Sequence, residues 1–234
     1  MSSLVKLHDA NPPHWGENVI TRWDNDHFKQ LEPFATSYMW TNSGSLNIFR
    51  VVGTDHPDYQ GQTWAWLLRN GKRMALNLPL HESNRGYYLS DEMKDPTMSF
   101  ITTDGHDWFV HCDGNHRTCI AKFDFHYSGL TELRGLSLRD WRFDHDLLSA
   151  MMRLAELAAE RRLPIRLEVT RATVSREDNA GWMREVYRPE INLHRDGRVF
   201  RIDAAAARGV ITWFEGPWFT RVFRAWPIAH MQEK

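Results

Sequence analysis

The clearest pattern of hydrophobic and polar positions lies in the middle of the chain. Two short apolar runs are separated by a polar loop, and the second run leads through a glycine turn into a helical pattern. Short apolar runs bounded by turn residues are typical of strands. In the helical pattern Ile120, Ala121 and Phe123 are expected to face the sheet. The pattern predicts strand, hairpin loop, strand, turn and helix over residues 98–102, 103–107, 108–112, 113–116 and 117–126.

The C-terminal part shows equally regular patterns. Asp144 precedes an amphipathic segment that ends at Pro164, which predicts a capped helix. Residues 165–169 then alternate between apolar and polar, as in a half-buried strand. Asp196-Gly197 is a signal for a type I′ hairpin, in which Leu193 would lie opposite Phe200 and Ile191 opposite Ile202.

Weaker patterns complete the expected elements, and together they favour the α+β class. The opening segment up to Trp23 is expected to be irregular because it is rich in Asn, Pro, Asp and His. One of the other expected helices ends before Gly71, a second contains several carboxylates, and a third contains aromatic residues. The expected helices are 26–31, 62–69, 82–93 and 219–226, and the expected strands are 45–52 and 74–78, the latter ended by Pro79.

Composition excludes several classes of protein. The chain of 234 residues is 42% hydrophobic and 25% charged, which suits a packed globular core. The formal net charge of -1 gives no general indication of nucleic-acid binding. Two cysteines, Cys112 and Cys119, are too few for a disulfide framework and are expected to be reduced thiols. The start of the chain does not resemble a signal peptide, so a cytoplasmic protein without membrane insertion is expected.

The turn Asp113-Gly114-Asn115-His116-Arg117 is the strongest candidate for chemistry. A helix that starts after an apolar strand presents unpaired N–H groups, and an anion such as phosphate binds readily there. Glycine permits a close approach of the backbone, and arginine offers two parallel donors to phosphate oxygens. Asp113 is expected to hold a metal ion or to orient Arg117, His116 to donate or shuttle a proton, and Thr118 to add a hydroxyl group. The alternative is a plain polar loop with an Asp cap.

The strand, the Asp-Gly-Asn-His-Arg turn and the following helix resemble the ParB/sulfiredoxin superfamily, over roughly residues 78–127. The resemblance implies that Gly114, His116 and Arg117 contact nucleotide phosphates. Asn115 stands where sulfiredoxins have their catalytic cysteine, so sulfinic acid reduction is not expected. The implied fold is a ParB/sulfiredoxin-like mixed sheet with helices, elaborated by N- and C-terminal extensions, over residues 1–71, 72–145 and 146–234.

The whole chain is more similar to the plasmid-borne fertility-inhibition branch of that superfamily, of the oncogenic-suppression type. This resemblance implies ATPase and DNase activity, with ATP and Mg²⁺ as cofactors. It also implies inhibition of conjugative or T-DNA transfer, with DNA and a type IV secretion component as partners. Under this interpretation Asp113, His116 and Arg117 are catalytic, Asp113 binds the metal, and Gly114, Asn115, Thr118 and Arg85 bind the nucleotide.

Three alternatives remain open at this point. The protein could bind a nucleotide or DNA and inhibit a secretion component without catalysis. Upstream carboxylates could join Asp113 around Mg²⁺, although each is also explained as part of a solvated surface: Glu82, Asp91, Glu92 and Asp95. Zinc is disfavoured, because Cys112 and Cys119 lack ligand spacing and because His111 and Cys112 on one strand would point to opposite faces.

Overall fold

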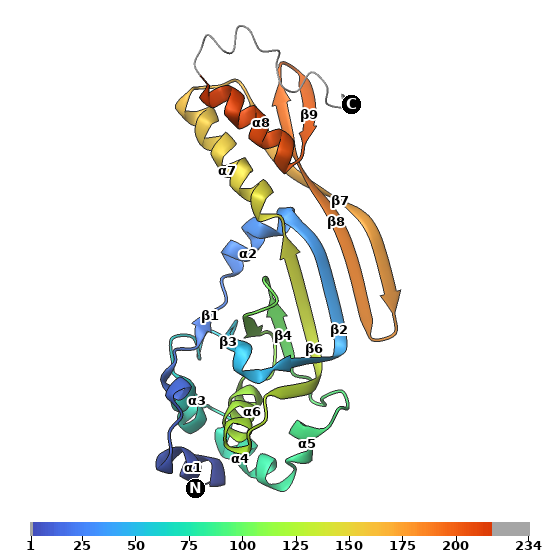
Figure 1. Cartoon of the computed structure of the whole chain (residues 1–234). Helices are drawn as coiled ribbons and strands as arrows, with labels where there is room; N and C mark the ends of the chain where they lie inside the picture. Colours follow the sequence, from blue (N-terminus) through green and yellow to red (C-terminus); the bar gives the residue numbers. More distant parts are fainter. Residues whose placement is uncertain (1, 217–234) are drawn as a thin grey trace. The chain divides into compact units, whose positions relative to one another are not determined.

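A computed structural model describes residues 2–216 as a mixed α+β protein (Figure 1). The α-helices are α1 Ser3–Ala10, α2 Asn25–Leu31, α3 Trp64–Asn70, α4 Met74–Ser83, α5 Gly86–Leu89, α6 Asn115–Ser128, α7 His145–Glu160 and α8 Ala204–Glu215. The short 3₁₀ helices are η1 His14–Glu17, η2 Glu32–Phe34 and η3 Ile48–Arg50. The strands are β1 Thr21–Arg22, β2 Ala35–Asn47, β3 Val51–Thr54, β4 Ser99–Thr102, β5 Trp108–Val110, β6 Glu132–Phe143, β7 Arg166–Asn179, β8 Trp182–Arg195 and β9 Arg198–Ile202.

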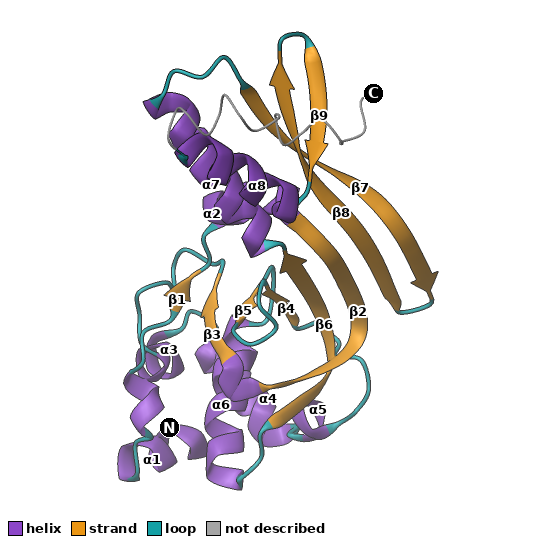
Figure 2. Ribbon diagram, turned by 45° about the horizontal axis from the view of Figure 1, so that its top comes forward, coloured by secondary structure: helices purple, strands orange, loops and turns teal. Residues whose placement is uncertain are grey.

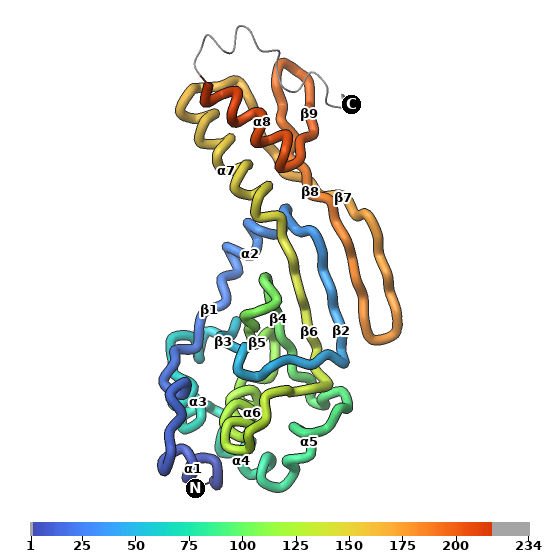
Figure 3. The backbone as a smooth tube through the Cα atoms, in the orientation of Figure 1, coloured from blue at the N-terminus to red at the C-terminus, as the bar shows by residue number. Residues whose placement is uncertain are grey.

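The described strands form one nine-stranded mixed sheet. Its order is β1-β3-β5-β4-β6-β2-β8-β7, and β9 pairs with β8. β1 with β3, β3 with β5, and β4 with β6 are parallel pairs, whereas β4 with β5 and β8 with β9 are antiparallel. β2 and β6 are far apart in the sequence but run side by side (Figure 3). Because parallel neighbours need long connections, the sheet order depends on contacts that local sequence does not specify.

The chain divides into two compact units that interleave along the sequence. Within the described residues, unit 1 comprises 2–25, 38–141 and 177–184, and unit 2 comprises 26–37, 142–176 and 185–216. These unit boundaries differ from the three consecutive domains expected from the sequence, which were divided at 71/72 and 145/146. That domain division stays a prediction.

The core of unit 1 is built around β4 and α6. All four residues of β4 are buried, which identifies it as an inner strand. On α6 the side chains of Ile120 and Phe123 are inaccessible to solvent, and Phe100 of β4 belongs to the same cluster. This confirms that the predicted helix turns its apolar side inward. Because α6 packs into this core, the turn that precedes it lies between the core and the surface.

The core of unit 2 is formed by two helices and a hairpin. α7 and α8 lie side by side (Figure 2). Leu154 of α7 and Val210 of α8 are fully buried, together with Leu193 of β8. Aspartate side chains cap both helices, because Asp144 accepts the N–H of Leu147 and Asp203 accepts that of Ala206. Each cap satisfies one of the N–H groups that a helix start leaves unpaired, while the apolar side of the helix is buried.

Several expectations from the sequence are confirmed. Asp196 and Gly197 both have positive φ, at 50° and 76°, as a type I′ turn requires. The register pairs Leu193 with Phe200 and Ile191 with Ile202. The antiparallel pair β4 and β5, the helix that follows it, α2, α3 and the capped helix α7 also form where the patterns predict them.

Other expectations are wrong. Residues 74–78 belong to helix α4 rather than to a strand, because Met74, Leu78 and His81 are buried with helical spacing whereas Leu76 is exposed. Pro79 lies inside this helix instead of ending an element. A continuous helix over 82–93 does not form, since α4 ends at Ser83 and only the short α5 follows.

The opening segment is also more ordered than expected, with α1, η1 and β1 before Trp23. α8 was not predicted, although Asp203 before an alanine-rich apolar stretch is a helix-start signal. The predicted helix over 219–226 lies outside the described residues. None of the described helices combines the length and the apolar character needed to cross a membrane.

Candidate functional site

The turn 113–117 connects the end of β5 to α6. After Val110 the backbone still pairs with β4, since His111 N–H donates to Ser99 and Ser99 N–H donates to Asp113, over 2.9 and 3.1 Å. Gly114 then adopts φ 118°, a positive value that residues with a side chain rarely adopt. This conformation turns the chain sharply, so α6 begins directly at the edge of the sheet.

No side chain caps the start of α6 within residues 2–216. The first helical bond runs from Thr118 N–H to the carbonyl of Gly114 over 2.7 Å. The N–H group of Gly114 is taken by Asp113 Oδ1 at 2.6 Å, but the next three N–H groups have no acceptor in the described part of the chain. Unpaired N–H groups and the partial positive charge of a helix start attract anions.

This helix start opens on a cavity of about 380 Å³ in unit 1. The cavity is lined by the whole predicted turn together with residues of α4, α5 and the segment before β4. These lining residues are Arg73, Leu76, Asn77, Leu80, His81, Asn84, Tyr87, Tyr88, Asp95, Pro96, Asp113, Gly114, Asn115, His116 and Arg117. The structure therefore brings five of the predicted site residues to one concave surface.

Arg117 is held by protein groups on all sides of its guanidinium. Nη1 donates to Tyr87 Oη at 2.7 Å and to the carbonyl of Pro96, and Nη2 donates to the carbonyl of Thr97 at 3.0 Å and to Asp113 Oδ2 at 2.8 Å. The terminal N–H groups are thus all occupied, and the side chain is largely buried. In this arrangement Arg117 fastens the segment before β4 to the helix start. The predicted direct contact of Arg117 with phosphate stays a prediction.

The surroundings of His116 favour the neutral form of its ring. The backbone N–H of Arg73 donates to Nε2 over 3.2 Å, and Tyr59 Oη lies 3.1 Å from the same atom. Burial lowers the pKa of His116, and the positive charges of Arg73 and His56 lower it further. With Nε2 as acceptor, the ring hydrogen is assigned to Nδ1. His116 is therefore suited to a single hydrogen bond rather than to a full positive charge.

Two carboxylates lie on the same cavity. The side chain of Asp113 is 64% exposed despite its bonds to Gly114 and Arg117, and Asp95 also lines the cavity. Asn115 is buried, at 8% exposure, and its side-chain amide makes no hydrogen bond within the described residues. An unpartnered amide beside exposed carboxylates is typical of a polar binding surface.

The structure does not bring Arg85 and Thr118 to this cavity. Arg85 Nε binds both carboxylate oxygens of Asp124, at 3.0 and 2.9 Å, and it lines a different cavity of about 620 Å³. Thr118 is fully buried, and its hydroxyl has no partner among the residues that the structure describes. Neither residue therefore lines this cavity.

Arg73 is the functional candidate that the sequence analysis missed. Its guanidinium is exposed, lines the cavity and makes no ion pair within residues 2–216. Its backbone also binds His116, which ties the start of α4 to α6. The adjacent Lys72-Arg73 pair was the available signal, but the wrong assignment of 74–78 to a strand separated it from the turn.

Comparisons of the chain with models of protein families, with curated proteins and with solved structures found no match. Arguments about function therefore depend on the geometry of this cavity and on the resemblance of the turn.

Proposed function

We propose that unit 1 binds a phosphate-bearing ligand, a nucleotide with Mg²⁺, in the cavity at the start of α6. The observation that supports this most strongly is the 14-residue helix α6, which has no side-chain cap within residues 2–216 and opens on a cavity lined by Arg73, whose guanidinium makes no ion pair with the described residues. Three free N–H groups and a guanidinium are complementary to the oxygens of a phosphate group. The proposal includes a ParB/sulfiredoxin-type nucleotide site, with Gly114, Asn115 and His116 at the phosphate.

The cavity also suits the rest of a nucleotide. Its volume of about 380 Å³ lies within the range of small-molecule sites, roughly 300–1,000 Å³. Leu76, Leu80 and Tyr87 provide apolar and aromatic surface on its wall. Such surface stacks against a nucleobase, while Asn77 and Asn84 supply donors and acceptors.

Asp113 and Asp95 are the residues that would hold Mg²⁺. Both line the cavity, and Mg²⁺ binds through one or two carboxylates together with phosphate oxygens and water. When bound, the ion would neutralise phosphate charge. Asp113 keeps its exposed carboxylate in place through Arg117, whose other bonds fix the loop around Pro96.

The resemblance extends this proposal to activity. An enzyme of this type would hydrolyse ATP and cleave DNA, and it would inhibit conjugative or T-DNA transfer through a type IV secretion system. A non-catalytic inhibitor that binds a nucleotide or DNA is the second candidate. It is favoured by the contacts of Asp113, His116 and Arg117, which are all engaged with protein groups, and by the burial that lowers the pKa of His116.

Calorimetric titration with ATP and Mg²⁺ tests the binding site. Arg73→Ala should weaken binding by about 1.5–3 kcal/mol, the contribution of a hydrogen bond to a charged group. Lys72→Ala is the matched control, because the neighbouring Lys72 pairs with Asp58 and does not line the cavity. Wild-type protein that binds no ATP, or equal affinities for both variants, would contradict the proposal.

Turnover separates the enzyme from the binding protein. ATP and plasmid DNA are incubated with the protein in Mg²⁺ or in EDTA, and DNA transfer is measured in parallel. If the protein is an enzyme, Asp113→Asn should retain ATP binding but lose about 100-fold in turnover, as for removal of one stabilising group. ATP binding without turnover, with transfer still blocked, would support the non-catalytic inhibitor.

A further inference from the structure

The ends of two parallel strands bring a second group of side chains together in unit 1. β3 and β5 are parallel, with Thr54 opposite Val110 in their last pair. Asp55 follows one strand and His111 the other, and Asp55 N–H donates to the carbonyl of Val110 over 3.0 Å. The pairing therefore extends one residue beyond the strands. The carboxyl ends of parallel strands are a common place for ligands.

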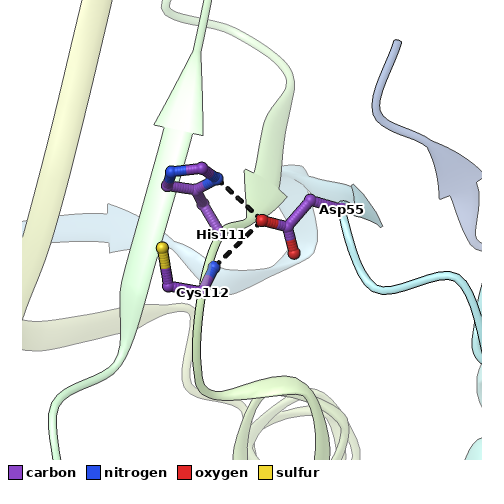
Figure 4. A group of neighbouring side chains, drawn as sticks. All are labelled: Asp55, His111 and Cys112. Atoms are coloured by element: carbon purple, nitrogen blue, oxygen red, sulfur yellow. Dashed lines mark hydrogen bonds and ion pairs between the residues drawn. The ribbon is translucent and has the colours of Figure 1, made fainter. Parts of the chain in front are cut away.

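Cys112 joins this group because its backbone is left-handed. Its φ is 70°, an uncommon value for a residue other than glycine. In an extended strand the side chains of His111 and Cys112 would point to opposite faces. β5 ends at Val110, so this alternation does not apply, and the argument against zinc from strand geometry is wrong. Figure 4 shows the thiol and the imidazole of these neighbours gathered beside the carboxylate of Asp55.

The three side chains present one ligand atom each at short range. These atoms all lie within 4.8 Å of one another. Asp55 Oδ2 lies 2.8 Å from His111 Nδ1 and accepts the backbone N–H of Cys112 at 3.1 Å (Figure 4). His111 Nδ1 is shielded from solvent and has Asp55 Oδ2 as its neighbour. The three ligand atoms thus lie close enough together to contact one ion.

We propose that Asp55, His111 and Cys112 bind a zinc ion and leave one coordination position to water. Carboxylate oxygen, imidazole nitrogen and thiolate sulfur are the donors that zinc takes in proteins, and open sites have three protein ligands. Tetrahedral bonds of about 2.0–2.3 Å separate donor atoms by roughly 3.3–3.6 Å. The observed separations, from 2.8 Å up to at most 4.8 Å, bracket this spacing.

Magnesium does not suit these residues, because a thiolate is a soft ligand and Mg²⁺ requires oxygen. None of the three residues lines the nucleotide cavity, although Cys112 directly precedes Asp113. The zinc site is therefore independent of the proposed nucleotide site. On binding, the thiol of Cys112 loses its proton to solvent as the zinc–sulfur bond forms, so binding should strengthen as the pH rises.

The full chain is titrated with Co²⁺, which replaces zinc and absorbs in the near ultraviolet when bound to a thiolate, in the presence of a reductant without thiols. One equivalent of Co²⁺ should produce the band, and Zn²⁺ should abolish it. Cys112→Ser should eliminate the band. Cys119→Ser is the matched control, because Cys119 is buried elsewhere and contacts the carbonyl of Trp64. Asp55→Asn and His111→Asn should each weaken binding more than about 10-fold, the low end for loss of even a supporting residue.

A wild-type chain without a saturable band, or a band that Cys112→Ser retains, would overturn the zinc site. Circular dichroism of each variant confirms folding, and Cys112 is exposed, so its substitution leaves the core intact. Alkylation gives a further distinction. If the wild type binds no metal but Cys112 reacts with iodoacetamide at a rate that falls in His111→Asn, the pair is an activated thiol and the proposal is rejected.

Discussion

The two units differ in what they bury. In the described part of the chain, every buried polar or charged side chain belongs to unit 1, among them His81, Asn115, Lys122 and Asp124. The buried residues of unit 2 are apolar, as on α7 and α8. Apolar side chains need no hydrogen bonds, whereas each buried polar side chain needs a partner. The stability of unit 1 therefore depends on specific partners for its buried polar groups, and both proposed sites lie in this unit.

The helix starts show the same difference. Asp144 and Asp203 cap α7 and α8 in unit 2, whereas α6 in unit 1 begins at Gly114 without a side-chain cap. A side-chain cap already accepts an N–H group at a helix start and places a carboxylate there, which leaves less for an anion to bind. The uncapped start, in contrast, faces a cavity. A helix start without a side-chain cap is thus a better indication of a binding site than a capped one.

The prediction with the largest expected effect tests whether the apolar core of unit 2 contributes to stability but not to ATP binding. Leu154→Ala removes a fully buried side chain of α7, which should cost about 3 kcal/mol of unfolding free energy in urea. Met152→Ala, on the exposed side of the same helix, should have little effect. ATP affinity should not change in the folded variant. A loss of ATP binding in the folded Leu154→Ala protein would show that the units are not functionally separate.

The second prediction concerns the charge buried in unit 1. Lys122 Nζ donates to the carbonyls of Val51 and Ile48, at 2.7 and 3.3 Å, and lies 4.5 Å from the centre of the Trp64 ring. Burial lowers the pKa of Lys122 to about 7. In the unfolded chain its pKa returns to about 10.4. Between these values the unfolded chain binds more protons, so stability should rise with pH.

From pH 7 to 8.5 this gain should reach about 1.5 kcal/mol, measured by urea unfolding at each pH. Lys122→Met should make the dependence shallower, and the exposed Lys29→Met should leave it unchanged. Burial raises the pKa of Tyr88 and of Cys119, which opposes the gain only at higher pH. Stability that falls from pH 7 to 8.5 in the wild type would contradict a neutral Lys122.

The smallest effect tests the caps. Asp144→Ala should cost about 1 kcal/mol, the usual contribution of an N-cap aspartate, because the N–H of Leu147 loses its acceptor. Asp146→Ala is the matched control, since Asp146 is exposed and, among the described residues, pairs with Arg208 over 3.4 Å. Thermal unfolding compares the two variants. Equal melting temperatures would mean that the cap does not stabilise α7.

Local signals in the sequence sufficed for elements whose neighbours in space are also neighbours in the chain. The Asp196-Gly197 hairpin, the capped α7 and the turn before α6 each depend on residues a few positions apart. The same signals failed at 74–78, where apolar residues at alternate positions fit both a strand and a helix. Only packing of Met74 and Leu78 against the unit 1 core selected the helix.

By itself, the sequence thus predicted the turn 113–117 and the start of α6, while anion binding at this helix start stays a prediction. Only the tertiary structure decided which side chains surround it. Arg117 is occupied by Tyr87, Pro96 and Thr97, and Arg73 comes to the cavity instead. Likewise Asp55 meets His111 and Cys112 only because β3 and β5 are parallel neighbours. Hydrogen bonds and metal ligands are short-range interactions, so they depend on distances in space that separation along the chain does not specify.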